Sequence, residues 1–300
     1  MSGHRGPNRR QRWVLVLLTL VWGLNWPVMK LGISGLPGAP QSYPPLTFRA
    51  TSMWLGLPVL AAVLGWLKLP FRVPRALWGE VLRLALPNMV LWHIVIIVAL
   101  QSLSSGRSAI LGYTMPVFSA LWGVLVYGER LERRQLLGVA AAGAGVLLLL
   151  QGELAHLAGA PGAALAVLAA ACVWALGTHQ LRRSSWPLPL LTLVFWMTVI
   201  TAVVITVLAL VFEHSAARWP PPHTAWAIAY NAVGVFAFAH AAWFYLARSL
   251  PPVASTLSVM LIPVLGTFSG AWLLGEALGW QDYAAMLLMV AAIAAVLWRR

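Results

Sequence analysis

Charged residues, and acidic residues above all, are scarce in this sequence of 300 residues. Charged residues make up 9% of the chain, compared with roughly 25% in soluble domains, whereas 61% of the residues are hydrophobic. This balance excludes an ordinary soluble domain and indicates a protein of the lipid bilayer. The single cysteine, Cys172, excludes a disulfide within the chain and a cysteine metal cluster. With only seven acidic residues, neither a metal nor a cofactor is expected.

Long apolar runs occupy most of the sequence. A run of about 20 residues can cross the hydrocarbon core of a bilayer as a helix. The runs are continuous rather than alternating, which excludes the strands of a membrane barrel. The sequence therefore predicts an all-α integral membrane protein with ten transmembrane helices. The predicted spans lie near residues 13–32, 46–66, 81–101, 108–127, 134–151, 162–181, 190–212, 224–247, 253–274 and 279–298.

Basic residues are distributed unevenly over the links between these runs. With a cytoplasmic amino terminus, the inner links and ends carry sixteen of the 20 Lys and Arg residues, and the outer links carry three. This positive-inside bias places both termini in the cytoplasm. It also accounts for the net charge of +13, so no nucleic-acid partner is expected, and phosphate binding by these arginines is the less favoured reading. Residues 1–12 are predicted as a basic cytoplasmic segment, followed by a first helix without a signal-cleavage site.

The sequence contains an internal repeat. A shift of 147 residues places Pro116 on Pro263, Gly123 on Gly270, Gly128-Glu129 on Gly275-Glu276 and His93 on His240. We therefore predict two five-helix units, residues 13–155 and 156–300. Because five is an odd number, the second unit enters the membrane from the opposite side. Such inverted repeats are typical of transporters, which bind substrate near the midplane between the two repeats.

These features together resemble a known family. Ten spans in a 5+5 repeat, Phe48-Arg49 early in the second span and a repeated Pro…Gly-Glu-x-Leu pattern are similar to the EamA family of the drug/metabolite transporter superfamily. The resemblance covers essentially the whole chain. It implies an exporter or permease of amino acids or other small metabolites in a bacterial inner membrane. The 17 tryptophans are most similar to the aromatic amino-acid exporters of that family.

Polar and aromatic residues within the predicted spans are the candidates for substrate binding. In the first span Trp22, Asn25, Trp26 and Met29 recur at helical spacing and share one face. His93 and His240 occupy repeat-related positions and are predicted to face each other across a central cavity. Each candidate has an alternative role, because intramembrane polar groups also bridge helices and tryptophans also pack in the core or face lipid. The predicted substrate-binding residues are Trp22, Asn25, Trp92, His93, Tyr113, Trp174, His240 and Trp243.

Glycine and proline within spans mark candidate hinges. Gly23 and Pro27 weaken the same region of the first span and predict a kink there. Pro116 and Pro263 are predicted to lie mid-helix in the fourth and ninth spans and to supply further bends.

Arg49 and the two Gly-Glu glutamates are predicted to have structural roles. Arg49 lies one turn after Pro45 and is expected to snorkel to the outer surface, with orientation of a substrate carboxylate at an outer gate as the alternative. Glu129 and Glu276 each follow a helix end and are expected to interact with the positive end of the next helix, the fifth or the tenth span. Proton coupling is the alternative for both glutamates, but neither lies at midspan.

The predicted function is that of a small-metabolite transporter and not of an enzyme. It would export amino acids, aromatic or otherwise apolar, by alternating access through a central cavity between the repeats. Transport of a nucleobase or vitamin is an alternative. An intramembrane serine hydrolase using the serines at 102–105 is a further alternative, although no GxSxG elbow accompanies them. The expected partners are a small-molecule substrate and the bilayer; the oligomeric state is open, and a monomer is consistent with the sequence.

Overall fold

The computed structural model describes residues 9–35, 42–128, 133–155, 160–216, 218–249 and 252–297. Within these ranges every regular element is a helix and no strand occurs. The α-helices are α1 (Arg9–Ser34), α2 (Pro45–Trp66), α3 (Trp78–Ala85), α4 (Leu91–Ala99), α5 (Ser105–Gly112), α6 (Met115–Tyr127), α7 (Arg133–Ala155), α8 (Pro161–Arg183), α9 (Leu190–Phe212), α10 (Pro222–Tyr230), α11 (His240–Ser249), α12 (Pro252–Leu274) and α13 (Trp280–Leu297). Two 3₁₀ turns, η1 (Arg75–Leu77) and η3 (His214–Ala216), and two π-helical segments, η2 (Leu86–Val90) and η4 (Asn231–Ala239), complete the described elements.

Eight helical segments are long and apolar enough to cross a membrane. They correspond to the first eight predicted spans. The other two predicted spans correspond to α12 and α13, whose described apolar stretches, Leu261–Leu274 and Trp280–Ala295, are shorter. The fold is therefore an all-helical membrane bundle, and the total of ten spans stays a prediction.

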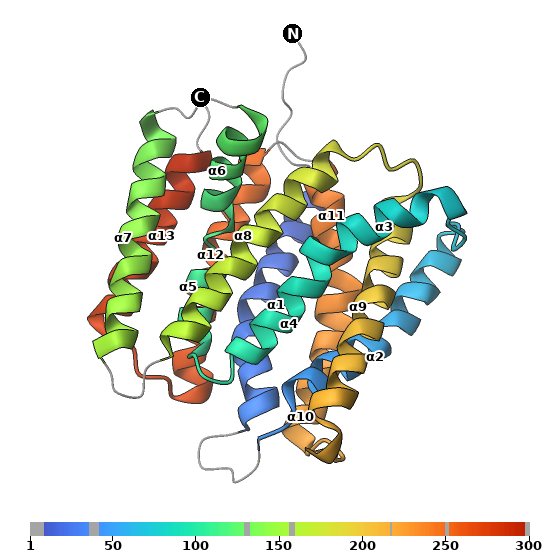
Figure 1. The fold of residues 1–300 in the computed structure, drawn as a ribbon, viewed down its shortest axis with the longest axis horizontal. Coiled ribbons are helices and arrows are strands. Elements are labelled where there is room, and N and C mark those ends of the chain that lie inside the picture. The colour runs from blue at the N-terminus through green and yellow to red at the C-terminus, as the bar shows by residue number, and fades with distance from the viewer. Residues whose placement is uncertain are drawn as a thin grey trace.

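Helices from the two halves of the sequence lie side by side throughout the bundle. In Figure 1, α7 runs beside α13 at one end of the view and α2 runs beside α9 at the other, with α1 near the middle. Helix α1 packs against α12, α10 and η4, all of which come from the second half of the sequence. The two predicted five-helix units therefore share one interior, and α1 lies at its centre.

Two π-helical segments occur at matching places in the sequence. Segment η2 ends three residues before His93, and η4 ends immediately before His240. π-Helical turns are rare and are found mostly at functional sites, because they shift the register of the side chains that follow. The sequence pattern gives no sign of either segment.

The two repeat-related prolines behave differently. Pro263 lies inside the continuous helix α12. Pro116 is instead the second residue of α6, and α5 ends four residues earlier, at Gly112. The expected mid-helix position of Pro116 is therefore wrong. A proline ring clashes with the carbonyl of the residue four positions before it, but Pro263 shows that a continuous helix can accommodate this proline, so Pro116 alone does not account for the break after Gly112.

The glycine of each Gly-Glu pair ends a helix. Gly128 follows α6 and Gly275 follows α12, and both have a φ angle of +66°. This left-handed conformation is the usual end of an α-helix and favours glycine strongly. Helix termination thus explains the repeated glycine. Glu129 lies outside the described residues.

Candidate functional site

One face of α1 forms the common wall of the candidate site. Asn25, Trp26 and Met29 are buried and Trp22 is half-buried, as expected for residues that share a face at helical spacing. Each aromatic residue of this stripe contacts a different group of side chains. Trp22 contacts residues of α11, and Trp26 contacts Trp92 of α4 and Tyr113, which directly follows α5.

The first group contains the two repeat-related histidines. The rings of His93 and His240 lie 5.3 Å apart, and both contact the ring of Phe236. Trp22 lies 5.9 Å from His240 and 5.6 Å from Trp243. His240 Nδ1 is 2.8 Å from the carbonyl oxygen of Val235, so Nδ1 carries the proton in this contact. Four of the predicted substrate-binding residues therefore gather here.

The second group is an aromatic cluster on the other side of Trp26. Trp92 and Trp174 lie 5.0 Å apart, and Trp26 lies 6.5 Å from both Trp92 and Tyr113. A Cβ atom on Gly112 would stand 2.9 Å from the indole of Trp26, so a glycine is needed for this close approach. The cluster brings together three further predicted residues, Trp92, Tyr113 and Trp174.

Arg49 is buried and does not snorkel. Only 1% of its surface is exposed, so the expected outer-surface position is wrong. Helix α2 packs against η4, and this contact buries the guanidinium between them. Arg49 Nη1 donates to Asn231 Oδ1 at 3.2 Å, Nη2 lies 2.6 Å from Met29 Sδ, and the guanidinium carbon is 5.6 Å from the centre of the Phe236 ring.

Several buried polar atoms along this interior have no hydrogen-bond partner among the described residues. A buried polar group without a partner costs roughly 1–3 kcal/mol, so most proteins avoid it. The atoms around α1 and its neighbours are Asn25 Oδ1, Arg49 Nε, His93 Nε2 and Ser108 Oγ. Because these atoms come from four different helices around the stripe of α1, we take this interior as the candidate substrate site.

Sequence reasoning missed three residues of this interior: Asn231, Phe236 and Ser108. Asn231 had a visible signal, because it is a lone amide in the apolar run near 224–247. Its amide nitrogen donates to the carbonyl of Ala227 at 3.0 Å, which turns its oxygen toward Arg49. Phe236 and Ser108 had no distinguishing pattern in so apolar a chain. No group of three potential metal ligands occurs among the described residues.

The predicted hinge at Gly23 is also a close helix contact. A Cβ atom on Gly23 would stand 2.6 Å from the Cβ of Leu265 on α12. Pro27 lies one turn later inside the continuous helix α1. The spacing of α1 and α12 therefore depends on the absence of a side chain at Gly23.

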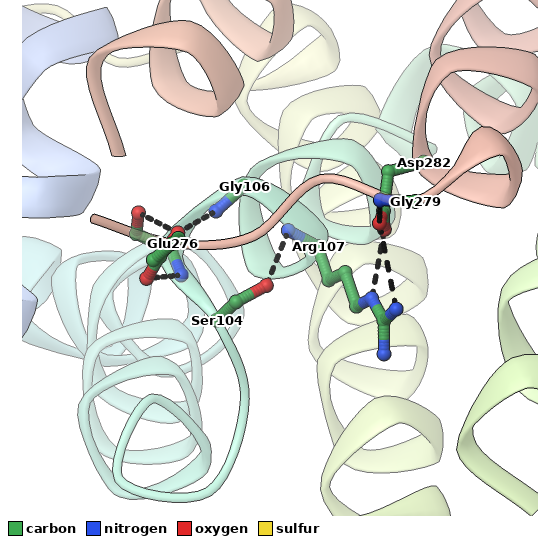
Figure 2. Close-up of polar contacts among 7 residues, drawn as sticks. Ser104, Gly106, Arg107, Glu276, Gly279 and Asp282 are labelled. Atoms are coloured by element: carbon green, nitrogen blue, oxygen red, sulfur yellow. Dashed lines mark hydrogen bonds and ion pairs between the residues drawn. The ribbon is translucent and has the colours of Figure 1, made fainter. Parts of the chain in front are cut away.

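Glu276 caps a helix, but not the one expected. Its carboxylate accepts hydrogen bonds from the backbone N–H of Ser105 at 2.7 Å, from the Ser105 hydroxyl at 2.8 Å and from the N–H of Gly106 at 3.3 Å. Figure 2 shows this carboxylate at the first turn of α5. Since α12 packs beside α5, the residue that follows α12 reaches the start of α5 rather than the start of α13.

An ion pair lies next to this cap. Arg107 Nε donates to Asp282 Oδ1 at 2.7 Å, and Asp282 also accepts from the N–H of Gly279 at 2.9 Å (Figure 2). Ser104 completes the start of α5 by accepting from the N–H of Arg107 at 3.3 Å. We call this set of contacts around Glu276 and Asp282 the α5 latch, because it ties the first half of the sequence to the second.

Lys30 and Glu213 close two further helix ends. Lys30 Nζ donates to the carbonyl oxygens of Leu100, Gln101 and Leu103, at 2.7 to 3.0 Å, just beyond the end of α4. Glu213 accepts from the N–H groups of residues 46 and 47 in the first turn of α2, at 2.9 and 2.8 Å. Both arrangements match charge to the end of a helix dipole.

A cleft of about 600 Å³ opens beside Glu213. Its walls come from the start of α2, the end of α4 and the end of α9. None of the predicted substrate-binding residues lines it. The cleft and the buried interior along α1 are therefore different places in the bundle.

Comparisons with known proteins match almost the whole chain. The model of the EamA-like transporter family matches residues 12–151 and residues 161–298. An uncharacterized transporter of Bacillus subtilis (strain 168), YoaV, is 23% identical over 261 residues, which cover 86% of each chain. A probable amino-acid metabolite efflux pump of Escherichia coli (strain K12) is 26% identical over 291 residues, which cover 94% of this chain and 93% of the relative.

An inner membrane transporter and a solved structure are similar over comparable lengths. The uncharacterized inner membrane transporter YedA of Escherichia coli (strain K12) is 26% identical over 290 residues, covering 94% of this chain and 89% of the relative. A crystal structure with 21% sequence identity shares the fold, with a TM-score of 0.69 over 96% of each chain. Because the family model accounts for both halves of the sequence, this chain is a membrane protein that belongs to the EamA-like transporter family.

Proposed function

We propose that this protein exports amino acids, aromatic or otherwise apolar, across the bacterial inner membrane. Family membership supports transport, and the relatives named as probable amino-acid metabolite efflux pumps support the substrate class. The relative named as an inner membrane transporter supports the location. Both termini would lie in the cytoplasm, as the distribution of basic residues predicts.

The observation that carries this proposal is the buried interior along α1. An imidazole pair and an indole cluster flank one stripe of α1, at 5.3 Å between the histidines and 5.0 Å between Trp92 and Trp174. Aromatic walls suit an apolar or aromatic side chain, and the few polar atoms supply orientation. The unpartnered atoms Asn25 Oδ1 and His93 Nε2 would bind the polar end of the substrate.

Alternating access between two inverted five-helix halves is the proposed mechanism. The family model matches two stretches of similar length, which supports the repeat. The pairs α1 with α12, α2 with α9 and α7 with α13 each join one half to the other, so rocking of the halves would open the interior at either end. The α5 latch would close one end, and Gly23 with Pro27 would allow α1 to bend.

Counterflow into proteoliposomes tests the proposal. Vesicles preloaded with one unlabelled amino acid are exposed to its labelled form, for a panel of amino acids, at two pH values. We expect saturable exchange of aromatic and large apolar amino acids. If the vesicles move no amino acid but exchange nucleobases or vitamins, the protein is still a transporter and the proposal that it carries amino acids is rejected.

Hydrolysis by the serines near α5 is not favoured. The Ser104 hydroxyl accepts from the N–H of Arg107, and the Ser105 hydroxyl donates to Glu276, so neither is paired with a histidine in these contacts. A serine nucleophile needs a neighbouring base. Absence of labelling by a fluorophosphonate probe is the expected result, and stoichiometric labelling of either serine would revive the enzyme alternative.

A further inference from the structure

Arg49 is a buried cation whose partners are all neutral. They are the amide oxygen of Asn231, the sulfur of Met29 and the ring of Phe236. No carboxylate among the described side chains pairs with it. A charged side chain inside a membrane bundle is costly, and such residues usually pair with an opposite charge or mark a substrate path. The guanidinium of Arg49 therefore has hydrogen-bond donors available but no carboxylate partner among the described residues.

The guanidinium retains free hydrogen-bonding capacity. It has five N–H donors, and the structure uses two of them, for Asn231 and Met29. Its Nε is buried and has no partner among the described residues. Met29 sulfur is a weak acceptor and is readily exchanged for a better one. A carboxylate approaching through Nε and one Nη would make the paired hydrogen bonds that arginine favours.

Asn231 holds the guanidinium in place for such a ligand. Its amide nitrogen is bound to the carbonyl of Ala227, so only the oxygen faces Arg49. Asn231 is also the first residue of the π-helical segment η4, which leads to Phe236 and His240. The orientation of Arg49 and the position of His240 are thus set by one irregular segment.

Phe236 links Arg49 to the imidazole pair. Its ring lies 5.6 Å from the Arg49 guanidinium carbon and 5.2 Å from the ring of His93, and it is fully buried. His93 Nε2 is the second unpartnered atom beside this ring. A bound carboxylate would supply a hydrogen-bond partner for the free Nε of Arg49 and for Nε2 of His93. The aromatic groups along α1 would then hold the body of the ligand.

On the basis of the proposed function, we infer that Arg49 binds the carboxylate of the transported molecule. The ligand class is a small monocarboxylate with an apolar or aromatic body. Asn231 is a positioning residue, and His93 is the second polar contact. Arg49 lies buried between α2 and η4.

The test compares probes that differ in the carboxylate. Tryptophan, tryptophan amide and indole-3-acetate are measured in competition for counterflow with the full-length wild type and with Arg49→Gln, Arg49→Lys and Arg72→Gln. The first two variants remove or relocate the guanidinium. Arg72 is an exposed arginine in the link after α2 and serves as the matched control.

The expected result is a loss of carboxylate preference. In wild type and Arg72→Gln, tryptophan and indole-3-acetate compete far better than the amide. In Arg49→Gln, tryptophan and indole-3-acetate compete about 10- to 100-fold more weakly than in wild type, whereas competition by tryptophan amide is unchanged. The carboxylate preference of Arg49→Lys lies between those of the wild type and Arg49→Gln. If the Gln variant does not fold, the Lys variant alone decides, because a structural role would weaken all three probes equally. Unchanged preference in the folded variants would overturn the assignment.

A second measurement separates this assignment from the proposed function. Thermal stabilisation of the purified protein by the sodium salts of tryptophan, indole-3-acetate and benzoate is recorded for the same variants. If wild type moves no amino acid but a carboxylate stabilises it only when Arg49 is present, the amino-acid proposal fails and the carboxylate site stands. If no carboxylate stabilises the wild type, the carboxylate site is rejected.

Discussion

Arg49 on α2 and Arg107 on α5 both join the first half of the chain to the second, but to partners of different charge. Arg107 meets the carboxylate of Asp282 at 2.7 Å, at the end of the bundle where α5 begins. Arg49 meets the neutral amide of Asn231 at 3.2 Å, deep between α2 and η4. The side chain of Arg107 is 20% exposed and Arg49 is 1% exposed. The more deeply buried arginine, Arg49, is thus the one without a carboxylate partner among the described residues.

This difference distinguishes polar groups that are satisfied at helix ends from polar groups that have no partner among the described residues of the interior. The described carboxylates whose contacts are known lie at or near helix ends, where they cap backbone N–H groups or pair with arginine. Such fully satisfied contacts stabilise one conformation. The interior along α1 instead keeps donors and acceptors unsatisfied among the described residues, and under the proposed function a bound substrate would satisfy them. Under the proposed function, the first set of contacts would close the ends of the bundle and the second would bind the substrate.

The largest expected effect comes from crowding the α5 latch through Gly270. A Cβ atom there would stand 2.6 Å from a carboxylate oxygen of Glu276 and would also collide with the Ser105 hydroxyl. We expect Gly270→Ala to displace the cap and to lower the free energy of unfolding by about 3 kcal/mol. Thermal unfolding in detergent, followed by tryptophan fluorescence, measures it. Gly143→Ala is the control, because its added Cβ would meet nothing within 4 Å beyond its chain neighbours and the backbone of its own helix. Equal unfolding midpoints for the two variants would contradict the stabilising role of the latch.

Removal of the Glu276 carboxylate is the next largest change. Glu276→Ala leaves three donors of Ser105 and Gly106 without their acceptor, and we expect a loss of about 2 kcal/mol. Glu276→Gln keeps one acceptor oxygen and should lose about half as much, with counterflow preserved. A folded Gln variant without any transport would instead assign Glu276 to proton coupling.

Much of the fold could be predicted from the sequence, because its determinants are local. Apolar runs of span length specify the helices, and Trp22, Asn25, Trp26 and Met29, which recur at helical spacing, all lie in α1. The break after Gly112 could not have been foreseen from Pro116 alone, because the repeat-related Pro263 lies inside a continuous helix. The π-helical segments could not, because nothing in the sequence distinguishes their register from that of an α-helix.

The misplaced residues of the site share one cause, which is packing between distant segments. Arg49 lies one turn from a helix start, and its depth depends on η4, which begins 182 residues later in the chain. Glu276 was assigned to the next helix along the chain, but its partners lie 170 and 171 residues earlier. A sequence pattern predicts whether one face of a helix is polar or apolar, but it does not predict which other helix packs against that face.

The ion pair offers a direct comparison of the two arginines. A double-mutant cycle of Arg107→Ala and Asp282→Ala should give a coupling energy of about 1–2 kcal/mol, since Asp282 is nearly buried and Arg107 is partly screened by solvent. The corresponding cycle of Arg49→Gln and Asn231→Ala should give less, about 0.5 kcal/mol, because the acceptor is neutral. Both are measured from unfolding midpoints in detergent without substrate. A larger coupling for the Arg49 pair would make Arg49 a structural residue.

The smallest expected effect has the opposite sign and comes from Asn25. Its Oδ1 is buried without a partner among the described residues, and leucine has a similar volume. Asn25→Leu should therefore raise the free energy of unfolding by up to about 1 kcal/mol, because it removes the penalty of the unsatisfied oxygen. Counterflow should fall at the same time, since the substrate loses a polar contact. Unfolding midpoints and initial exchange rates are measured on one preparation, with Thr19→Val as control, because the Thr19 hydroxyl donates to Leu15 O. If the leucine variant is less stable, Asn25 is a helix-bridging residue and the stripe of α1 is a packing surface rather than a binding wall.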